Sequence, residues 1–319
     1  MEIEQAVEAI AKKFEMENKE AEIIVNKAHE GGEISDEFPL EQWLEKRFFP
    51  NCVLIDEAGY SRMCIDALKI LSSTAATDYG SSRQRDMGQL WADMTRGYLG
   101  ELSFQLFLEK KCGINSKLGH EKGTLKDYLP MDIHQVQEKG GEYRTPKINV
   151  GVKTTKWNGI WMDIPGDQFN HSDIHAFVKI GGGRDHLFAF FKTLSVFKDK
   201  VLKRGQEVGS LSPEESDTLY NSLPSFKPIP AYICGFASSA DKFKKLSYEG
   251  KLGKKHYNIH AWNGSIQSGD LELLKKKEKV PGQVKFAAIG EFSHESGYLF
   301  NSGNLHWTDE DWRTVCKRL

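Results

Sequence analysis

The chain has 319 residues, of which 39% are apolar and 28% are charged, and its formal net charge is −2. This composition is typical of a globular protein that buries a core, and it excludes a low-complexity chain. No run of about 20 apolar residues could span a membrane, and the acidic N-terminus lacks the pattern of a signal peptide. We therefore expect a cytoplasmic protein with no membrane partner.

Charge is unevenly divided between the two halves of the chain. Residues 1–150 hold 19 Lys and Arg against 26 Asp and Glu, a net charge of −7, whereas residues 151–319 hold 24 against 19, a net charge of +5. Within 231–285 the count is 11 against 5. A nucleic-acid-binding protein needs a basic face. The C-terminal half is the candidate for that face, and a solvated lysine-rich surface is the alternative interpretation.

The five cysteines are odd in number and scattered, and no CxxC motif occurs: Cys52, Cys64, Cys112, Cys234 and Cys316. This pattern predicts reduced thiols and no zinc ribbon.

Helical spacing of apolar residues dominates the N-terminal quarter. Residues 2–29 are predicted to form one or two helices that end at Gly31, and further helices are predicted over 39–49 and 61–77. We therefore expect residues 1–80 to form a helical subdomain.

A long helix is predicted from about Gln84 to Lys111. Glu101 lies on or beside its apolar stripe, and Gly97 and Gly100 stand close by. Glycine inside a helix costs roughly 1 kcal/mol relative to alanine, so two glycines indicate a close approach to a sheet or a ligand. A carboxylate facing the core must be paired, protonated or metal-bound, and a salt bridge to a basic residue is the structural alternative. The stripe comprises Met87, Leu90, Trp91, Met94, Tyr98, Leu102 and Leu106.

Strand patterns follow the long helix. A strand is predicted over Tyr128–Val136, around Asp132, and another over 147–155. The second strand alternates strictly, with Ile148, Val150 and Val152 on one face and Asn149, Gly151 and Lys153 on the other.

Asn158-Gly159 is a strong hairpin signal, which predicts that a strand over 160–164 pairs back on the preceding strand. A short helical or irregular piece is expected over 167–173. Mixing of helices and strands in this order predicts an α/β fold of mixed α+β character. Further elements are predicted as strands over Ile174–Ile180, Leu187–Thr193, Ala231–Phe236 and Val284–Gly290, and as helices over Ser210–Leu223, Ser239–Leu246 and Asp309–Lys317.

Three residues of the central region supply the groups that phosphodiester hydrolysis requires. A hard cation such as Mg²⁺ binds one or two carboxylates, which Asp132 and Glu101 can offer. Lys153 can orient the attacking water and stabilise the charge of the transition state.

The order helix-Glu101, Pro130-x-Asp132 and then a strand ending at Lys153 resembles the PD-(D/E)xK nuclease superfamily, and within it the type II restriction endonucleases. The segments TRGYLGELSFQLFLEK, VKTTKW and HSDIHAFVKI carry the resemblance, which covers about residues 85–193. It implies a restriction-endonuclease-like core, a central mixed β-sheet flanked by helices, over residues 81–200. Residues 201–319 would complete this core and contact DNA.

The resemblance also implies a function. It implies a Mg²⁺-dependent, sequence-specific endonuclease for double-stranded DNA that works as a homodimer, with Mn²⁺ able to substitute. By this resemblance Asp132 and Glu101 bind the metal and Lys153 acts beside the water.

Gly151 departs from the family pattern, because an acid is expected two residues before the lysine. Three interpretations stay open. First, the acid has migrated. Hairpin counting pairs Asp163 with Thr154 and so places it on the face opposite Lys153 unless a β-bulge intervenes, and Asp167 or Gln168 could reach the site instead.

In the second interpretation, Glu101 takes over the role of the missing acid and a backbone carbonyl at Val152 completes the metal site. In the third, the protein cleaves weakly or not at all. A non-cleaving DNA-binding protein, or an engineered inactive variant, is therefore the alternative function. A helical scaffold that works through residues 1–80 is a further class.

Residues at the end of the lysine strand are the candidates for DNA contact near the scissile phosphate: Thr154, Thr155, Lys156, Trp157 and Asn158. The lysines of 242–255 and 275–285 are candidates for phosphate contacts. His171 and His175 are a weak metal-binding pattern, and Gly181-Gly182-Gly183 is expected to be a turn between strands.

Overall fold

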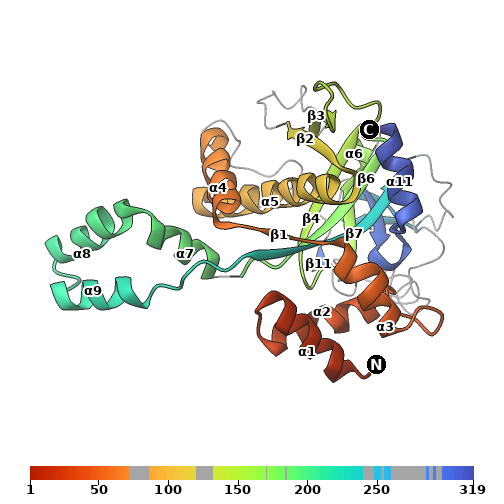
Figure 1. The fold of residues 1–319 in the computed structure, drawn as a ribbon. Coiled ribbons are helices and arrows are strands. Elements are labelled where there is room, and N and C mark those ends of the chain that lie inside the picture. Colours follow the sequence, from red (N-terminus) through yellow and green to blue (C-terminus); the bar gives the residue numbers. More distant parts are fainter. Residues whose placement is uncertain are drawn as a thin grey trace.

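The computed structural model describes residues 1–71, 86–119, 132–169, 171–183, 185–239, 248–252, 255–259, 285–286, 290–291 and 297–319. Its centre is a four-stranded mixed sheet of order β1-β7-β6-β4, with helices on both faces (Figure 1). The strands are β1 (Cys52–Ile55), β4 (Val150–Lys156), β6 (Ile174–Ile180) and β7 (Ile229–Ser238). Only β4 and β6 run parallel. The predicted α/β class is confirmed at this level.

The N-terminal segment is helical, as predicted, except for one strand. Helix α2 ends at Gly31, and β1 joins the central sheet from within this segment. The helices are α1 (Ile3–Phe14), α2 (Asn18–Glu30), α3 (Leu40–Gln42), the π-helix η1 (Trp43–Phe48), the 3-10 helix η2 (Phe49–Asn51) and α4 (Glu57–Leu71). The predicted helix over 61–77 thus begins earlier, and residues 72–77 lie outside the described residues.

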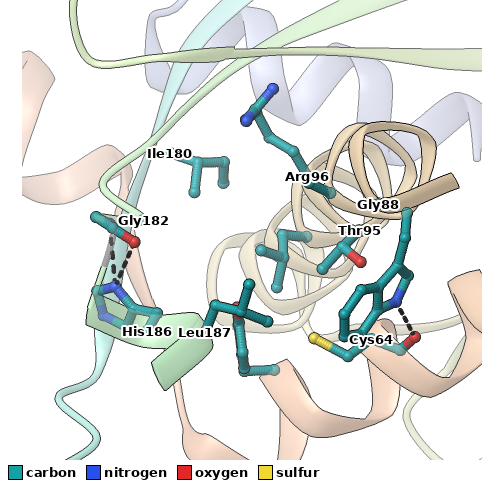
Figure 2. Close-up of a pocket in the computed structure, with 13 residues that line it drawn as sticks. Cys64, Gly88, Thr95, Arg96, Ile180, Gly182, His186 and Leu187 are labelled. Carbon is teal, nitrogen blue, oxygen red and sulfur yellow. Dashed lines mark hydrogen bonds between the residues drawn. The ribbon is translucent and has the colours of Figure 1, made fainter. Parts of the chain in front are cut away.

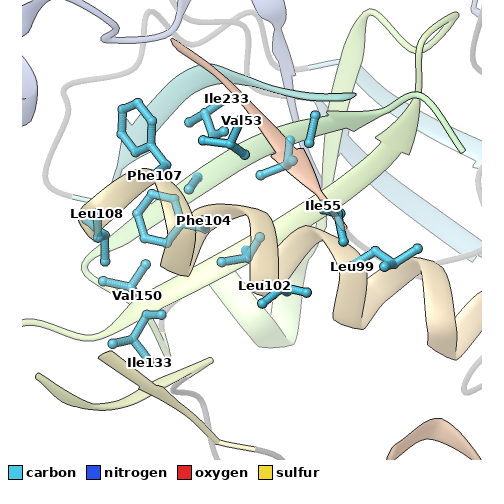
Figure 3. Packing of buried hydrophobic residues seen from close by; sticks show 14 of the residues in the cluster. Val53, Ile55, Leu99, Leu102, Phe104, Phe107, Leu108, Ile133, Val150 and Ile233 are labelled. Carbon is cyan, nitrogen blue, oxygen red and sulfur yellow. The ribbon is translucent and has the colours of Figure 1, made fainter. Parts of the chain in front are cut away.

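The long predicted helix is α5 (Met87–Cys112), which crosses one face of the sheet. The carboxylate of Asp86 accepts a hydrogen bond from Gln89 N at 2.9 Å and caps its start, and Gly113 ends it with φ 65°. Its apolar face meets the strands in the main core (Figure 3). This core includes Leu99, Leu102, Phe104, Phe107, Leu108, Val150 and Ile233.

Alternation along β4 places side chains on the two faces as predicted. Val150 and Val152 are buried in the core beneath α5. Gly151 faces the other way, toward His175 and Ser172. On that opposite face a second core, containing Phe177 and Tyr232, packs against α1, α2 and η1.

The hairpin prediction at Asn158-Gly159 is wrong. Strand β5 (Trp161–Pro165) pairs antiparallel with β12 (Gly297–Asn301) near the C-terminus instead of with β4. Met162 and Ile164 are fully buried in the second core, and their burial there stabilises β5 outside the central sheet. The helix α6 (Gly166–Phe169) follows β5, near the predicted helical piece.

The predicted strand over Leu187–Thr193 is instead the helix α7 (Asp185–Thr193). Its short apolar run did not distinguish a strand from a helix, and Ala189 and Phe190 are the buried pair. With η3 (Phe197–Leu202), α8 (Lys203–Glu207) and α9 (Pro213–Ser222) it forms an arm that extends away from the sheet (Figure 1). The predicted helix over 210–223 corresponds to α9, and Ser212 and Glu215 form its capping box.

A second antiparallel pair, β2 (Ile114–Leu118) and β3 (Ile133–Glu138), lies outside the four-stranded sheet. The predicted strand around Asp132 therefore begins one residue after it, and residues 128–131 lie outside the described residues.

In the C-terminal region the strand predicted over Ala231–Phe236 is confirmed within β7, and so is the final helix α11 (Asp309–Arg318). The capping box of α11 joins Thr308 and Asp311. The remaining described strands are β8 (Tyr248–Leu252), β9 (Lys255–Ile259), β10 (Lys285–Phe286) and β11 (Gly290–Glu291).

Two C-terminal predictions fall largely outside the described residues: the short helix over 239–246 and the lysine-rich segments 242–255 and 275–285. Of the strand predicted over 284–290, only residues 285–286 and 290 are described as strand. Within the parts of the chain that are described, no helix combines the length and the apolar character needed to cross a membrane.

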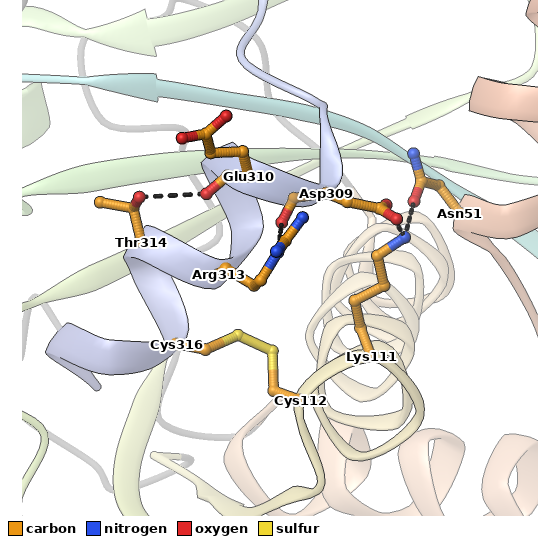
Figure 4. The surroundings of a disulfide bond; sticks show 8 residues. All are labelled: Asn51, Lys111, Cys112, Asp309, Glu310, Arg313, Thr314 and Cys316. Carbon is orange, nitrogen blue, oxygen red and sulfur yellow. Dashed lines mark hydrogen bonds and ion pairs between the residues drawn. A yellow bond between two sulfur atoms is a disulfide. The ribbon is translucent and has the colours of Figure 1, made fainter.

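Cys112 and Cys316 form a disulfide between the ends of α5 and α11 (Figure 4), which corrects the prediction that all five thiols are reduced. The two residues are separated by 204 positions, so their spacing in the sequence carried no sign of the pairing. Trp312 packs on Phe107 with ring centroids 4.8 Å apart and holds α11 against α5. The other three cysteines are free and buried.

A buried ionic network joins the N-terminal helices to the sheet. Lys179 Nζ on β6 lies 2.7 Å from Glu33 Oε1, and both side chains are almost fully buried. The other oxygen of Glu33 accepts hydrogen bonds from Tyr232 and Trp43. Burial alone would raise the pKa of Glu33, but Lys179 and Arg47 outweigh it and lower the pKa to about 2.

We predict that Glu33→Gln destabilises the protein by about 3–5 kcal/mol at pH 7, because Lys179 would stay buried without its counter-charge. The pKa of folded Glu33 is about 2 and its ordinary value is 4.5. This contribution is therefore present above pH 4.5 and is lost as the pH falls toward 2. Denaturant unfolding at pH 7 and at pH 3 should show the gap between wild type and variant narrowing, with exposed Glu22→Gln as control. A gap that does not depend on pH would contradict the assignment.

Candidate functional site

Asp132 is fixed against the outer edge of β4 by two backbone contacts. Its N–H donates to the carbonyl of Val150 at 3.1 Å, and its carboxylate Oδ2 accepts from Val152 N–H at 2.5 Å. Strand β4 is an edge strand of the sheet, so this side of it is available to Asp132. The carboxylate of Asp132 is thereby bound to Val152, the residue that precedes Lys153.

Lys153 is the centre of the site. Its ammonium donates a hydrogen bond to the side-chain carbonyl of Gln168 on α6. Burial lowers the pKa of Lys153, and the negative charges of Asp132, Asp163 and Glu101 act against that shift. One amide therefore hydrogen-bonds Lys153, and three carboxylates from other parts of the chain lie near enough for their charges to act on it. We call Lys153 and these four residues the lysine cluster.

Glu101 reaches this cluster from α5. Burial raises its pKa to about 8, and the charge of Lys153 opposes the rise. The helix comes close to β4 here, because a Cβ added to Gly100 would lie 1.8 Å from Thr154 Oγ1. Gly100 thus allows the close approach to the sheet that the sequence indicated.

Gly97 has a different role. A Cβ there would meet nothing within 4 Å, and its carbonyl accepts a hydrogen bond from the hydroxyl of Thr154 at 3.5 Å.

Asp163 is the residue that sequence reasoning misplaced. The predicted hairpin put its side chain on the face opposite Lys153, yet its charge acts on Lys153 more strongly than that of Glu101 does. Because β5 pairs with β12, the register of a β4–β5 hairpin does not apply. The nearness of Asp163 to Lys153 in the sequence was the only available signal.

Gly151 offers no ligand, and its surroundings explain the small residue. A Cβ at this position would lie 3.0 Å from both His175 Nδ1 and Ser172 Oγ. His175 is buried opposite Gly151, and its Nε2 lies 3.1 Å from the carbonyl of Phe169. Burial lowers the pKa of His175 to about 4, so the imidazole is neutral at pH 7. His171 does not share this position, since it precedes β6.

The predicted DNA-contact residues fall into two groups. Lys156 and Asn158 are exposed at the end of β4. Thr154 contacts α5, Thr155 lies against Gly159, and Trp157 packs on Phe48 with ring centroids 6.2 Å apart. The structure therefore gives the second group packing roles. Gly181–Gly183 connects β6 to a helix, which corrects the predicted turn between strands.

The acidic and amide side chains of the lysine cluster offer oxygen atoms, the ligand type that Mg²⁺ prefers. Across the described residues, no group of three or more His, Cys, Asp and Glu side chains lies close enough to hold a metal ion. Magnesium sites often use one or two carboxylates with water and substrate oxygens, and Asp132 and Asp163 fit that donor set.

A separate cavity of about 460 Å³ lies on another flank of α5, between α4, α5 and the start of α7 (Figure 2). Its walls are mostly apolar, and the residues that line it include no carboxylate. Burial raises the pKa of Cys64, in this wall, to about 11, so its thiol is protonated at pH 7. None of the lysine-cluster residues lines this cavity.

Comparison of the chain with protein-family models, with curated proteins and with solved structures found no match in any of the three.

We predict opposite effects for alanine at the two glycines of α5. Gly100→Ala should destabilise the protein by about 1–3 kcal/mol, because its methyl group would collide with Thr154. Gly97→Ala should be neutral or stabilise by up to about 1 kcal/mol, because its methyl group meets open space and alanine favours helix. Denaturant unfolding of the matched pair measures both. Equal effects would show that α5 does not depend on contact at Gly100.

Proposed function

We propose that the protein is a Mg²⁺-dependent endonuclease that hydrolyses phosphodiester bonds of double-stranded DNA at specific sequences. The observation that supports this function best is the lysine cluster at the edge strand β4, where the charges of Asp132, Asp163 and Glu101 act on Lys153 and Asp132 is bound to β4. A buried lysine whose pKa is lowered and whose neighbours include several acids is a candidate for a functional site.

The elements that carry the cluster support a restriction-endonuclease-like core. A helix supplies Glu101, the residue before β3 is Asp132, and β4 supplies Lys153 and runs parallel to β6. This order agrees with the PD-(D/E)xK resemblance of residues 85–193. We propose that Asp163 replaces the acid that Gly151 lacks.

The reaction joins a water oxygen to phosphorus while the bond from phosphorus to the leaving ester oxygen breaks. The water loses a proton to solvent, and the leaving oxygen gains one from solvent. Lys153 orients the attacking water and donates hydrogen bonds to the charge that develops on the phosphoryl oxygens. Asp132 stays in place because Val152 N–H binds its carboxylate, and Gln168 orients the ammonium of Lys153.

Asp132 and Asp163 would hold the Mg²⁺, with the carbonyl of Val152 and water as further oxygen ligands. When bound, such a cation neutralises phosphoryl charge and lowers the pKa of a bound water. Mn²⁺ accepts the same oxygen donors and would substitute. The described residues of one chain contain one lysine cluster, and two strands must be cut, so we also propose a homodimer.

We predict that Asp132→Ala, Lys153→Ala and Asp163→Asn each slow DNA cleavage by about 100-fold or more, because each removes a charged group from the reacting centre. A plasmid digest with and without Mg²⁺ measures the rate, and discrete fragments indicate site-specific cutting. Asp199→Asn, an exposed acid of the distant arm, is the matched control and should cut normally. Circular dichroism checks that each variant is folded.

The variants also separate the alternatives. If Asp163→Asn cuts DNA normally while Asp132→Ala does not cut, the role of the second carboxylate belongs to Glu101 instead of Asp163. Tight DNA binding by wild type without cleavage would favour a non-cleaving DNA-binding protein. Absence of both binding and cleavage would refute the proposal.

We predict that Gly151→Glu does not raise cleavage. His175 and Ser172 already occupy the space next to this residue, and Asp163 already supplies the acid. The plasmid assay should show equal or slower cutting, and unfolding measurements should show a loss of stability of about 1–3 kcal/mol. Faster cutting by this variant would mean that the wild-type site is one ligand short.

A further inference from the structure

Strands β2 and β3 form a two-stranded ribbon with one buried and one exposed face. Ile114, Ser116, Ile133 and Val136 are buried, and the carbonyl of Ser116 accepts a hydrogen bond from Gln105 of α5. The ribbon is therefore anchored to the core. Its other face, which we call the amide face, carries Asn115, Lys117, Gln135 and Gln137.

Residues of the amide face are aligned in cross-strand pairs. Asn115 lies opposite Gln137 and donates to its Oε1 at 3.3 Å, and Lys117 lies opposite Gln135 and donates to its Oε1 at 3.1 Å. The ammonium of Lys117 also lies 4.0 Å from the ring centroid of Tyr143. These contacts hold the four side chains in a defined arrangement on the surface of the ribbon.

The chemistry of this row matches the edges of DNA bases. Asn and Gln side chains form paired hydrogen bonds with adenine, and Lys binds the acceptors of guanine. The major groove admits a two-stranded β-ribbon. The amide face carries no carboxylate, which the phosphates lining the groove would repel.

The position of the ribbon relative to the lysine cluster supports the same role. Asp132 immediately precedes β3, so Gln135 lies three residues from a proposed metal ligand. At about 3.3 Å per residue this is roughly 10 Å along the strand. DNA rises about 3.4 Å per base pair, so the amide face would lie about three to five base pairs from the scissile phosphate.

We propose that the amide face of the β2–β3 ribbon enters the major groove and reads base edges there, which makes Gln135, Gln137, Asn115 and Lys117 specificity-determining residues. This inference rests on the proposed nuclease function and extends it by naming the part of the protein that selects the sequence. The exposed polar face of a solvated ribbon is the alternative.

The test uses a pool of DNA duplexes with a randomised central segment. Wild type cuts the pool, and sequencing of the cut ends gives the base preference at each position. Gln135→Ala and Gln137→Ala should each relax the preference at one or two positions by about 5- to 150-fold, the discrimination that one paired contact provides. Gln206→Ala, an exposed glutamine of the arm, is the matched control and should leave every preference unchanged.

A variant of a residue proposed to contact the DNA backbone, Lys156→Ala, is compared with the ribbon variants. Lys156→Ala should slow cutting of all sequences alike and leave the base preference unchanged. If both ribbon variants keep the wild-type preference while wild type cuts specifically, the ribbon inference is overturned and the nuclease function stands. Wild-type cutting without any base preference also overturns the inference. Failure of wild type to bind or cut any duplex overturns both.

Discussion

The arrangement of the site depends on how closely α5 approaches β4. At Gly100 the helix lies so near Thr154 that no side chain fits between them. This contact sets the depth at which Glu101 enters the cluster around Lys153, and the same helix is tied to β2 through Gln105. Gly100 therefore lets the part of α5 that carries Glu101 pack directly on β4. A larger residue there would collide with Thr154.

Two buried lysines show how similar groups take different roles. Burial disfavours the charge of both. At Lys179 the closely bound Glu33 outweighs burial and raises the pKa, so the pair is charged at neutral pH and joins the N-terminal helices to the sheet. At Lys153 burial prevails over three acids, and the pKa is lowered. Glu33 thus holds the first lysine in its charged state, whereas burial disfavours the charge of the second.

The β5–β12 pair accounts for the position of Asp163, whose charge acts on Lys153. By leaving the central sheet, β5 brings Asp163 toward Lys153, and α6 then carries Gln168 to the same place. His175 occupies the space beside Gly151. Pairing with a strand near the C-terminus thus fixes where this acid lies.

Local patterns in the sequence determined much of this protein: the long helix with Glu101, the alternation that separates Val152 from Lys153, and the cap of α11. These features depend on neighbours a few residues apart, so periodicity and capping rules detect them. The tertiary structure alone decided the partner of β5, the helical state of α7, the Cys112–Cys316 disulfide and the place of Asp163. Each of these depends on burial against, or contact with, distant segments, and no spacing along the chain encodes such a contact. The stretch from Asp132 to Lys153 could thus be singled out from its residues as a candidate site, but the effect of Asp163 on Lys153 could be found only in the folded chain.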